Sequence, residues 1–136
     1  MSDVVAVDRD NLGLQCTYAE ALIQAGRFDQ ALKVASQAVQ LQPDSPLALQ
    51  MLAEAQLEKD LDRAEATTTR ILELAPSHGA GYDLRGRIAL KRGHYAAAES
   101  HFREALRKEP GNSGYSNNLG LALRHQHRDK AAVEAF

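Results

Sequence analysis

Apolar residues recur along the chain every three or four positions, and no stretch alternates strictly between apolar and polar residues as a half-buried strand would. The stretch HYAAAESHFREALRKEP, from His94 to Pro110, is typical: alanines stand at helical spacing beside Tyr95 and Phe102, and a proline follows. A proline cannot continue the helix that precedes it. The pattern predicts eight helices, over residues 11–25, 28–41, 46–59, 61–75, 79–92, 95–108, 113–126 and 129–136.

The helical pattern repeats with a period of about 34 residues. Successive apolar runs end at Pro43, Pro76 and Pro110, which lie 33 and 34 residues apart. Small residues recur with nearly the same period. They stand in the first helix of each repeat, at Ala19, Ala53, Gly86 and Gly120, and in the second helix, at Ala31, Ala64, Ala98 and Ala132. Each repeat therefore consists of a helix, a tight turn, a second helix and a turn that contains proline.

The second repeat is one residue shorter than the others. Gly26 and Gly93 end the first helix of the first and third repeats, whereas the same turn of the second repeat reads EKDLDRA and contains no glycine. The missing residue is most simply this glycine, which would supply the left-handed conformation that ends a helix. The repeats cover about 12–45, 46–78, 79–112 and, in part, 113–136 of a single array. Residues 1–11 are similar to the tail of a preceding repeat.

The alanines and glycines have a packing role, because small residues let two helices approach closely while larger side chains fill the space around the crossing. We expect Gly86 to face Ala98 across such a crossing, with Tyr82, Tyr95 and Phe102 around it. A helix pair cannot bury its apolar face alone, so each repeat has to stack on its neighbour. The sequence predicts an all-α fold, an α-solenoid of antiparallel helix pairs.

Composition narrows the classes of partner. The chain has 136 residues, and its net charge of -2 gives no reason to expect a nucleic acid or an anionic membrane. No segment has the apolar length needed to span a bilayer, and the opening MSDVVAVDRD does not have the pattern of a secretory signal. The single cysteine, Cys16, cannot form an internal disulfide, which favours a reducing compartment and a cytoplasmic location.

Candidate catalytic residues are few. His125 and His127 are two positions apart on a predicted helix, so they point to different sides and make a poor metal pair. Cys16 has the acidic Glu20 one turn further on and no basic partner at that spacing, so it is not an activated nucleophile. No phosphate-binding loop is present. We therefore expect no enzymatic activity, no cofactor and no metal.

The repeat resembles that of the tetratricopeptide repeat family. The family motif combines a bulky residue, a Leu-Gly pair, an aromatic, an alanine, a second aromatic, a second alanine and a proline over 34 residues. The third repeat carries it most fully, with Tyr82, Gly86, Tyr95, Ala98, Phe102, Ala105 and Pro110. Two departures are Arg85, where the family has a buried leucine, and His127, which replaces the turn glycine of the fourth repeat.

The resemblance implies a right-handed superhelix that binds a peptide segment of a partner protein in a concave groove lined by the first helix of each repeat. It leaves open a non-catalytic portion of a longer enzyme and a self-assembling module. Spacing of i, i+4 and i+7 on each first helix gives the expected groove residues: Glu20, Ile23, Gln50, Glu54, Leu57, Asp83, Arg87, Leu90, Asn117, Leu121 and Arg124. Lys91 and Asn118 lie just beside them and complete the expected groove.

Charge is unevenly distributed over these positions. The first two repeats offer glutamates, whereas the last two offer Arg87, Lys91 and Arg124, which suit a carboxylate-bearing segment. Ordinary solvated helix faces remain the alternative interpretation, because surface charges are usually just that. Chaperone-binding family members hold an acidic C-terminal tail with Lys, Asn and Arg side chains. Only Asn118 of this chain matches that set, which argues against a chaperone tail.

The two ends of the chain carry apolar residues that suggest self-association. These residues are Val4, Val5 and Val7 at one end, and Leu119, Leu123 and Phe136 at the other. The end of a repeat array exposes an apolar face unless a polar helix covers it. Two explanations stay open: the ends were cut from a longer array, or the ends of two molecules pack together in a heterologous, head-to-tail contact. Both explanations leave the same apolar surface bare, so we expect weak self-association of this chain at high concentration.

Overall fold

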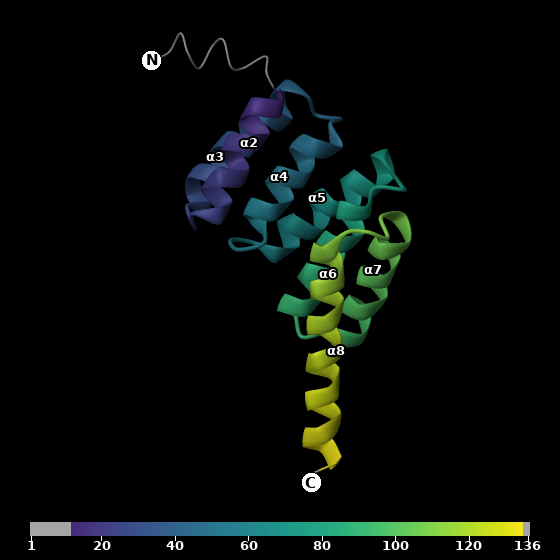
Figure 1. The fold of residues 1–136 in the computed structure, drawn as a ribbon. Coiled ribbons are helices and arrows are strands. Elements are labelled where there is room, and N and C mark those ends of the chain that lie inside the picture. Colours follow the sequence, from purple (N-terminus) through teal and green to yellow (C-terminus); the bar gives the residue numbers. More distant parts are fainter. Residues whose placement is uncertain (1–11, 135–136) are drawn as a thin grey trace. The chain divides into compact units, whose positions relative to one another are not determined.

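A computed structural model describes residues 12–134, with the side chains of residues 13–128. Every element in this range is an α-helix, which confirms the all-α prediction (Figure 1). The helices are α2 (Leu12–Gln24), α3 (Phe28–Leu41), α4 (Pro46–Gln56), α5 (Leu61–Leu74), α6 (Gly79–Lys91), α7 (Tyr95–Lys108) and α8 (Ser113–Glu134). The chain divides into two compact units, of which the N-terminal unit ends at Pro76 and the C-terminal unit begins at Ser77. The predicted single array and its right-handed twist stay predictions.

Local sequence explains where the helices begin and end. Gly26 and Gly93 both adopt a φ of 78° in the turns after α2 and α6, as predicted for residues that end a helix in the left-handed conformation. The shorter turn after α4 is closed differently. The N–H of Asp60 donates to the carbonyl of Gln56 at 2.7 Å, and the Asp60 side chain caps α5 by accepting from the N–H of Asp62 at 3.1 Å.

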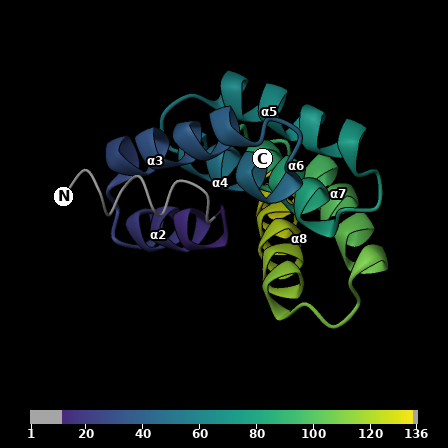
Figure 2. The ribbon, with the colours of Figure 1, turned by 90° about the horizontal axis from the view of Figure 1, so that it is seen from above.

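Alanine dominates the core of the N-terminal unit, where α3 packs against both α2 and α4 (Figure 2). One cluster contains Cys16, Ala19, Ala35 and Met51, and a second contains Leu22, Ala31 and Ala55. Because Ala31 and Ala35 are fully buried, α3 lies close to both neighbours. Cys16 is buried in this core, and the burial raises the pKa of its thiol.

The C-terminal unit contains a close crossing at Gly86, as the sequence predicts. The ring of Phe102 lies directly over Gly86: a Cβ added to Gly86 would lie 2.6 Å from Phe102 Cδ1. Ala98 is fully buried in the same cluster as Phe102. The flat ring fills the space that the missing side chain of the glycine leaves.

Tyr95 makes a contact that the sequence does not predict. It stacks on His125 of α8, with ring centroids 4.6 Å apart and an interplanar angle of 9°. Gln126 Nε2 donates to Glu99 Oε1 at 2.7 Å, which adds a second link between α7 and α8. Together with the fully buried Ala122, these contacts hold one face of α8 against α7.

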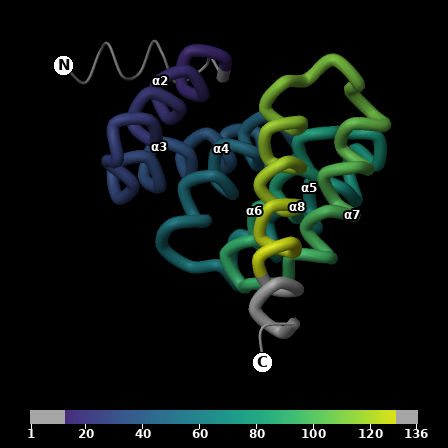
Figure 3. The backbone as a smooth tube through the Cα atoms, turned by 60° about the horizontal axis from the view of Figure 1, so that its bottom comes forward, coloured from purple at the N-terminus to yellow at the C-terminus, as the bar shows by residue number. Residues whose placement is uncertain are grey.

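The largest departure from the prediction is α8. The sequence predicts two helices, 113–126 and 129–136, whereas one helix runs from Ser113 to Glu134 and extends past the ends of α6 and α7 (Figures 1 and 3). The reason is the missing turn residue. At the corresponding turn of the third repeat Gly93 has a positive φ, but His127 stands in the fourth repeat, and no non-glycine residue in the described part of the chain adopts that conformation.

Candidate functional site

The predicted groove residues of the N-terminal unit lie on α2 and α4, which contact each other. Glu20 is exposed, and Ile23 packs against the Leu22, Ala31 and Ala55 cluster. Gln50 and Glu54 are half-buried. These helices therefore present a largely polar surface.

Leu57 is buried, with an exposed fraction of 3%, and does not offer the apolar groove surface that the sequence predicts. It is the C-cap of α4 and keeps helical backbone angles, with φ -52° and ψ -36°. Leu57 follows the fully buried Ala53 by one helical turn, so the two side chains share a face that points inward.

In the C-terminal unit, Asp83 of α6 and Asn118 of α8 form a polar link that the sequence does not predict. Asn118 Nδ2 donates to Asp83 Oδ1 at 2.9 Å, and Arg87 Nη1 lies 3.7 Å from Asp83 Oδ2. Asp83 is buried, with an exposed fraction of 7%, and so it is a correction to the predicted groove. The pair is 35 residues apart. That separation is close to the repeat period, and this was the available signal that the two first helices are neighbours.

Burial controls the protonation of Asp83. Removal from water raises the pKa of its carboxyl group, while the hydrogen bond from Asn118 and the charge of Arg87 lower it. Glu109 raises the pKa further, and the net shift is upward. A buried carboxylate with two partners at its oxygens acts as a tie between α6 and α8, and Asn118 is engaged in that tie.

The remaining predicted residues of this unit form a surface that we call the α6–α8 surface: Arg87, Leu90, Lys91, Asn117, Leu121 and Arg124. Arg87 and Leu90 are half-buried, and the other four residues are exposed. Leu90 packs on the cluster that contains Phe102. Among the described residues, Asn117 and Arg124 have no side-chain hydrogen bond or ion pair, so the amide and the guanidinium are available to a ligand.

A separate hollow of about 350 Å³ lies between α7 and α8, lined by Arg103, Leu106, Arg107 and Leu119. Arg103 is engaged by Glu99 at 2.9 Å and Arg107 by Glu104 at 3.0 Å. No predicted groove residue lines this hollow.

The predicted head-to-tail contact involves residues at both ends of the chain. Four of them, Val4, Val5, Val7 and Phe136, lie outside the described residues, so this contact stays a prediction.

The described residues also allow a search for catalytic and metal chemistry. In residues 13–128, no group of three His, Cys, Asp or Glu side chains is placed to hold a metal ion. Burial and the charge of Arg85 lower the pKa of His101, whose ring is half-buried. None of the described helices is both long and apolar enough to cross a membrane.

The fold and the surface define a class of protein: an α-helical repeat protein built from helix–turn–helix pairs. More specifically, the chain belongs to the tetratricopeptide repeat family. One model of that family matches residues 1–53 and 22–88, and another matches residues 84–136. No curated protein sequence matches the chain.

Solved structures show the same fold at low sequence identity. The first TPR domain of the human RPAP3 protein has a TM-score of 0.75 and 18% identity, and the match covers 88% of this chain and 95% of that one. The first TPR of Spaghetti (RPAP3), bound to the HSP90 peptide SRMEEVD, has a TM-score of 0.71 and 19% identity over 88% and 96% of the two chains. A Thermobaculum terrenum O-GlcNAc transferase mutant has a TM-score of 0.75 and 19% identity, over 85% of this chain but 22% of that one.

Proposed function

We propose that the chain is a non-catalytic scaffold for protein–protein interaction, and that it binds a carboxylate-bearing peptide segment of a partner on the α6–α8 surface. The observation that carries the proposal is the pair Asn117 and Arg124. Both side chains are exposed, and neither forms a hydrogen bond or an ion pair with another described residue. An asparagine amide can hydrogen-bond to a peptide backbone, and a guanidinium can bind a carboxylate through two N–H groups. Leu121 lies between them and offers an apolar contact.

The structure of Spaghetti (RPAP3) with an HSP90 peptide supports peptide binding as a use of this fold. We do not propose the HSP90 peptide as the ligand of this chain, because only Asn118 matches the residues that hold a chaperone tail. Asn118 donates to Asp83 at 2.9 Å. A different acidic segment, recognised by Asn117 and Arg124, is the ligand that the chemistry favours. We also propose a cytoplasmic location, because the single cysteine cannot form an internal disulfide and so favours a reducing compartment.

The experiment uses a fluorescent peptide with alternating glutamate and leucine residues, and an otherwise identical peptide in which glutamine replaces glutamate. The acidic peptide should bind, its affinity should fall as salt is added, and Arg124→Glu should weaken it about tenfold or more. Asn117→Ala should weaken both peptides, because it removes a backbone contact. Lys33→Glu, at an exposed lysine of α3, is the matched control and should change nothing. Equal binding of the acidic peptide to Arg124→Glu and to the unchanged chain would refute the proposal.

The O-GlcNAc transferase match favours a second candidate, in which this chain is the non-catalytic part of a longer enzyme. The two candidates make the same prediction for the α6–α8 surface. Purification of the protein from its source cell distinguishes them. The first candidate predicts a separate binding partner that is purified with the chain, and the second predicts a catalytic domain on the same polypeptide.

A further inference from the structure

The C-terminal unit has a second surface that the proposed function does not use. Three residues on one face of α8, Ser116, Gly120 and Leu123, correspond to Tyr82, Gly86 and Ala89 of α6, each 34 residues earlier. On α6, Gly86 and Ala89 are buried, and Gly86 is pressed by the ring of Phe102 from α7.

Within residues 13–128, no side chain covers the same face of α8. A Cβ added to Gly120 would meet no atom within 4 Å, and Leu123 is 40% exposed. We call the residues Ser116, Gly120, Leu123 and His127 the outer face of α8. They are spaced so that they lie on one side of the helix, and all four are exposed.

The side of α8 that carries Tyr115 and Ala122 is the buried one. It is occupied by contacts with α7, such as the stacking of His125 on Tyr95. The outer face therefore resembles a surface on which a helix could pack. Gly120 corresponds to Gly86, and α7 places the ring of Phe102 on Gly86. By this comparison, the helix that fits the outer face places an aromatic ring on Gly120.

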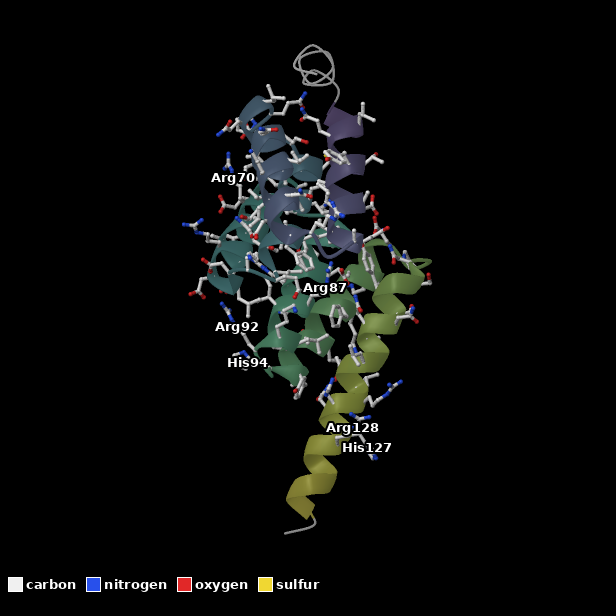
Figure 4. All side chains as sticks on the ribbon, turned by 90° about the vertical axis from the view of Figure 1, so that its left-hand side faces the viewer. Arg70, Arg87, Arg92, His94, His127 and Arg128 are labelled. Atoms are coloured by element: carbon white, nitrogen blue, oxygen red, sulfur yellow. The ribbon has the colours of Figure 1, made fainter. Side chains whose placement is uncertain are left out.

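Charge narrows the chemistry of that helix. Arg124 and Arg128 are exposed next to the outer face, and His127, which is part of that face, projects with Arg128 from the second half of α8 (Figure 4). No acidic residue stands among positions 113–128 of α8. A helix with acidic residues beside its apolar stripe would be attracted to this surface, whereas a basic helix would be repelled.

We propose that the outer face of α8 is a docking site for an acidic amphipathic helix of a partner protein, with an aromatic side chain seated on Gly120. The site differs from the α6–α8 surface in its apolar contacts, which are Gly120 and Leu123, whereas Arg124 borders both surfaces. Docking a helix against a bare helix face is a recognised mode of peptide binding, in which anchors at i, i+3, i+4 and i+7 fill the surface. Here we infer the anchor residues of the docking helix from the way in which α7 packs on α6.

The chain provides the probe for a test. A synthetic peptide of residues 94–109 has the sequence of α7 with its N-cap, including Ala98 and Phe102. A second peptide carries Glu in place of Arg103 and Arg107, which are exposed on α7 and are not needed for the apolar stripe. A third has Ala in place of Phe102. Each peptide is labelled and titrated with the full chain, and fluorescence anisotropy reports binding.

We expect the acidic peptide to bind about tenfold more tightly than the α7 peptide at low salt, and the peptide without the aromatic ring to lose most of its affinity. Gly120→Leu should abolish binding without lowering the melting temperature of the chain, because the added side chain enters open space on the outer face. Leu123→Asp should also abolish binding. Asn117→Ala, which disables the α6–α8 surface, should leave it unchanged.

Three outcomes would overturn the proposal. The first is binding that Gly120→Leu leaves intact. The second is a lower melting temperature for Gly120→Leu, which would mean that residues of the chain itself already fill the outer face. The third is concentration-dependent sedimentation of the unchanged chain that Gly120→Leu removes, which would make a second copy the occupant. Failure of the α6–α8 surface would instead appear only in the Asn117→Ala measurement, because Arg124 borders both surfaces.

Discussion

Helices α6 and α8 begin with related sequences but have different surroundings. Both carry a glycine at the same point of the repeat, Gly86 in α6 and Gly120 in α8. Gly86 is buried beneath a phenylalanine ring, and Gly120 is open to solvent. The difference begins at the turn. Gly93 reverses the chain after α6 so that α7 can fold back, whereas α8 continues through His127. A small residue therefore makes a close crossing only when the turn after it supplies the second helix.

The largest expected effect is at the aromatic ring that covers Gly86. Phe102 is fully buried, so Phe102→Ala should lower the free energy of unfolding by about 4 kcal/mol through lost burial and a cavity. Leu123→Ala, on the uncovered helix, should change it by less than about 0.5 kcal/mol. Urea denaturation of both variants measures the contrast. Similar losses at the two positions would show that α8 is covered in solution.

The paired glycines give a sharper version of the same comparison. Gly86→Ala places a methyl group 2.6 Å from Phe102 Cδ1 and should destabilise the chain by about 2 kcal/mol, because the ring has to move. Gly120→Ala meets nothing within 4 Å. It should stabilise the chain by up to about 1 kcal/mol, since alanine favours the helix over glycine. Thermal melts with opposite shifts are expected, and shifts of the same sign would contradict the difference between the two helices.

The smallest expected effect concerns the tie between α6 and α8. The pKa of Asp83 is raised, so the folded chain holds this proton more tightly than the unfolded chain does. Its contribution to stability therefore falls as pH rises from the ordinary aspartate range through the raised pKa, and is constant above it. Asp83→Asn keeps an oxygen acceptor for Asn118 but does not titrate.

The measurement is the difference in unfolding free energy between the unchanged chain and Asp83→Asn, followed across the acid range. Relative to the variant, the unchanged chain should lose stability as pH rises, and the difference should level off near neutrality. The contributions of the other carboxylates are the same in both proteins and cancel in this difference. A difference that grows with pH would mean that Arg87 and Asn118, and not burial, dominate the environment of Asp83.

Much of the fold could be predicted from sequence because it depends on local rules. The proline and glycine positions set the ends of the first six described helices to within a few residues, and the spacing of small residues indicated which helices approach closely. The nearest contact of each small residue was harder to predict. The ring of Phe102 lies over Gly86, and that contact depends on how side chains fill three-dimensional space.

The candidate site was predicted less completely, for a similar reason. Helical spacing placed Asn117, Leu121 and Arg124 on an exposed surface, as found. The same spacing could not show that Leu57 and Asp83 face inward, because burial depends on which neighbour covers each turn of a helix. The exposed outer face of α8 was missed altogether, since the sequence predicts a helix that folds back over it.

The sequence alone determined the helical repeat, its period of about 34 residues and the family to which the chain belongs. Those features arise from backbone preferences that act over a few residues: glycine in a left-handed turn, proline after a helix, and apolar residues on one helical face. Only the tertiary structure decided that Asp83 is tied to Asn118 and that Gly120 is uncovered. Burial is set by the sum of contacts from distant segments. Because the chain does not reverse after residue 126, no following helix packs on Gly120, and this glycine stays exposed.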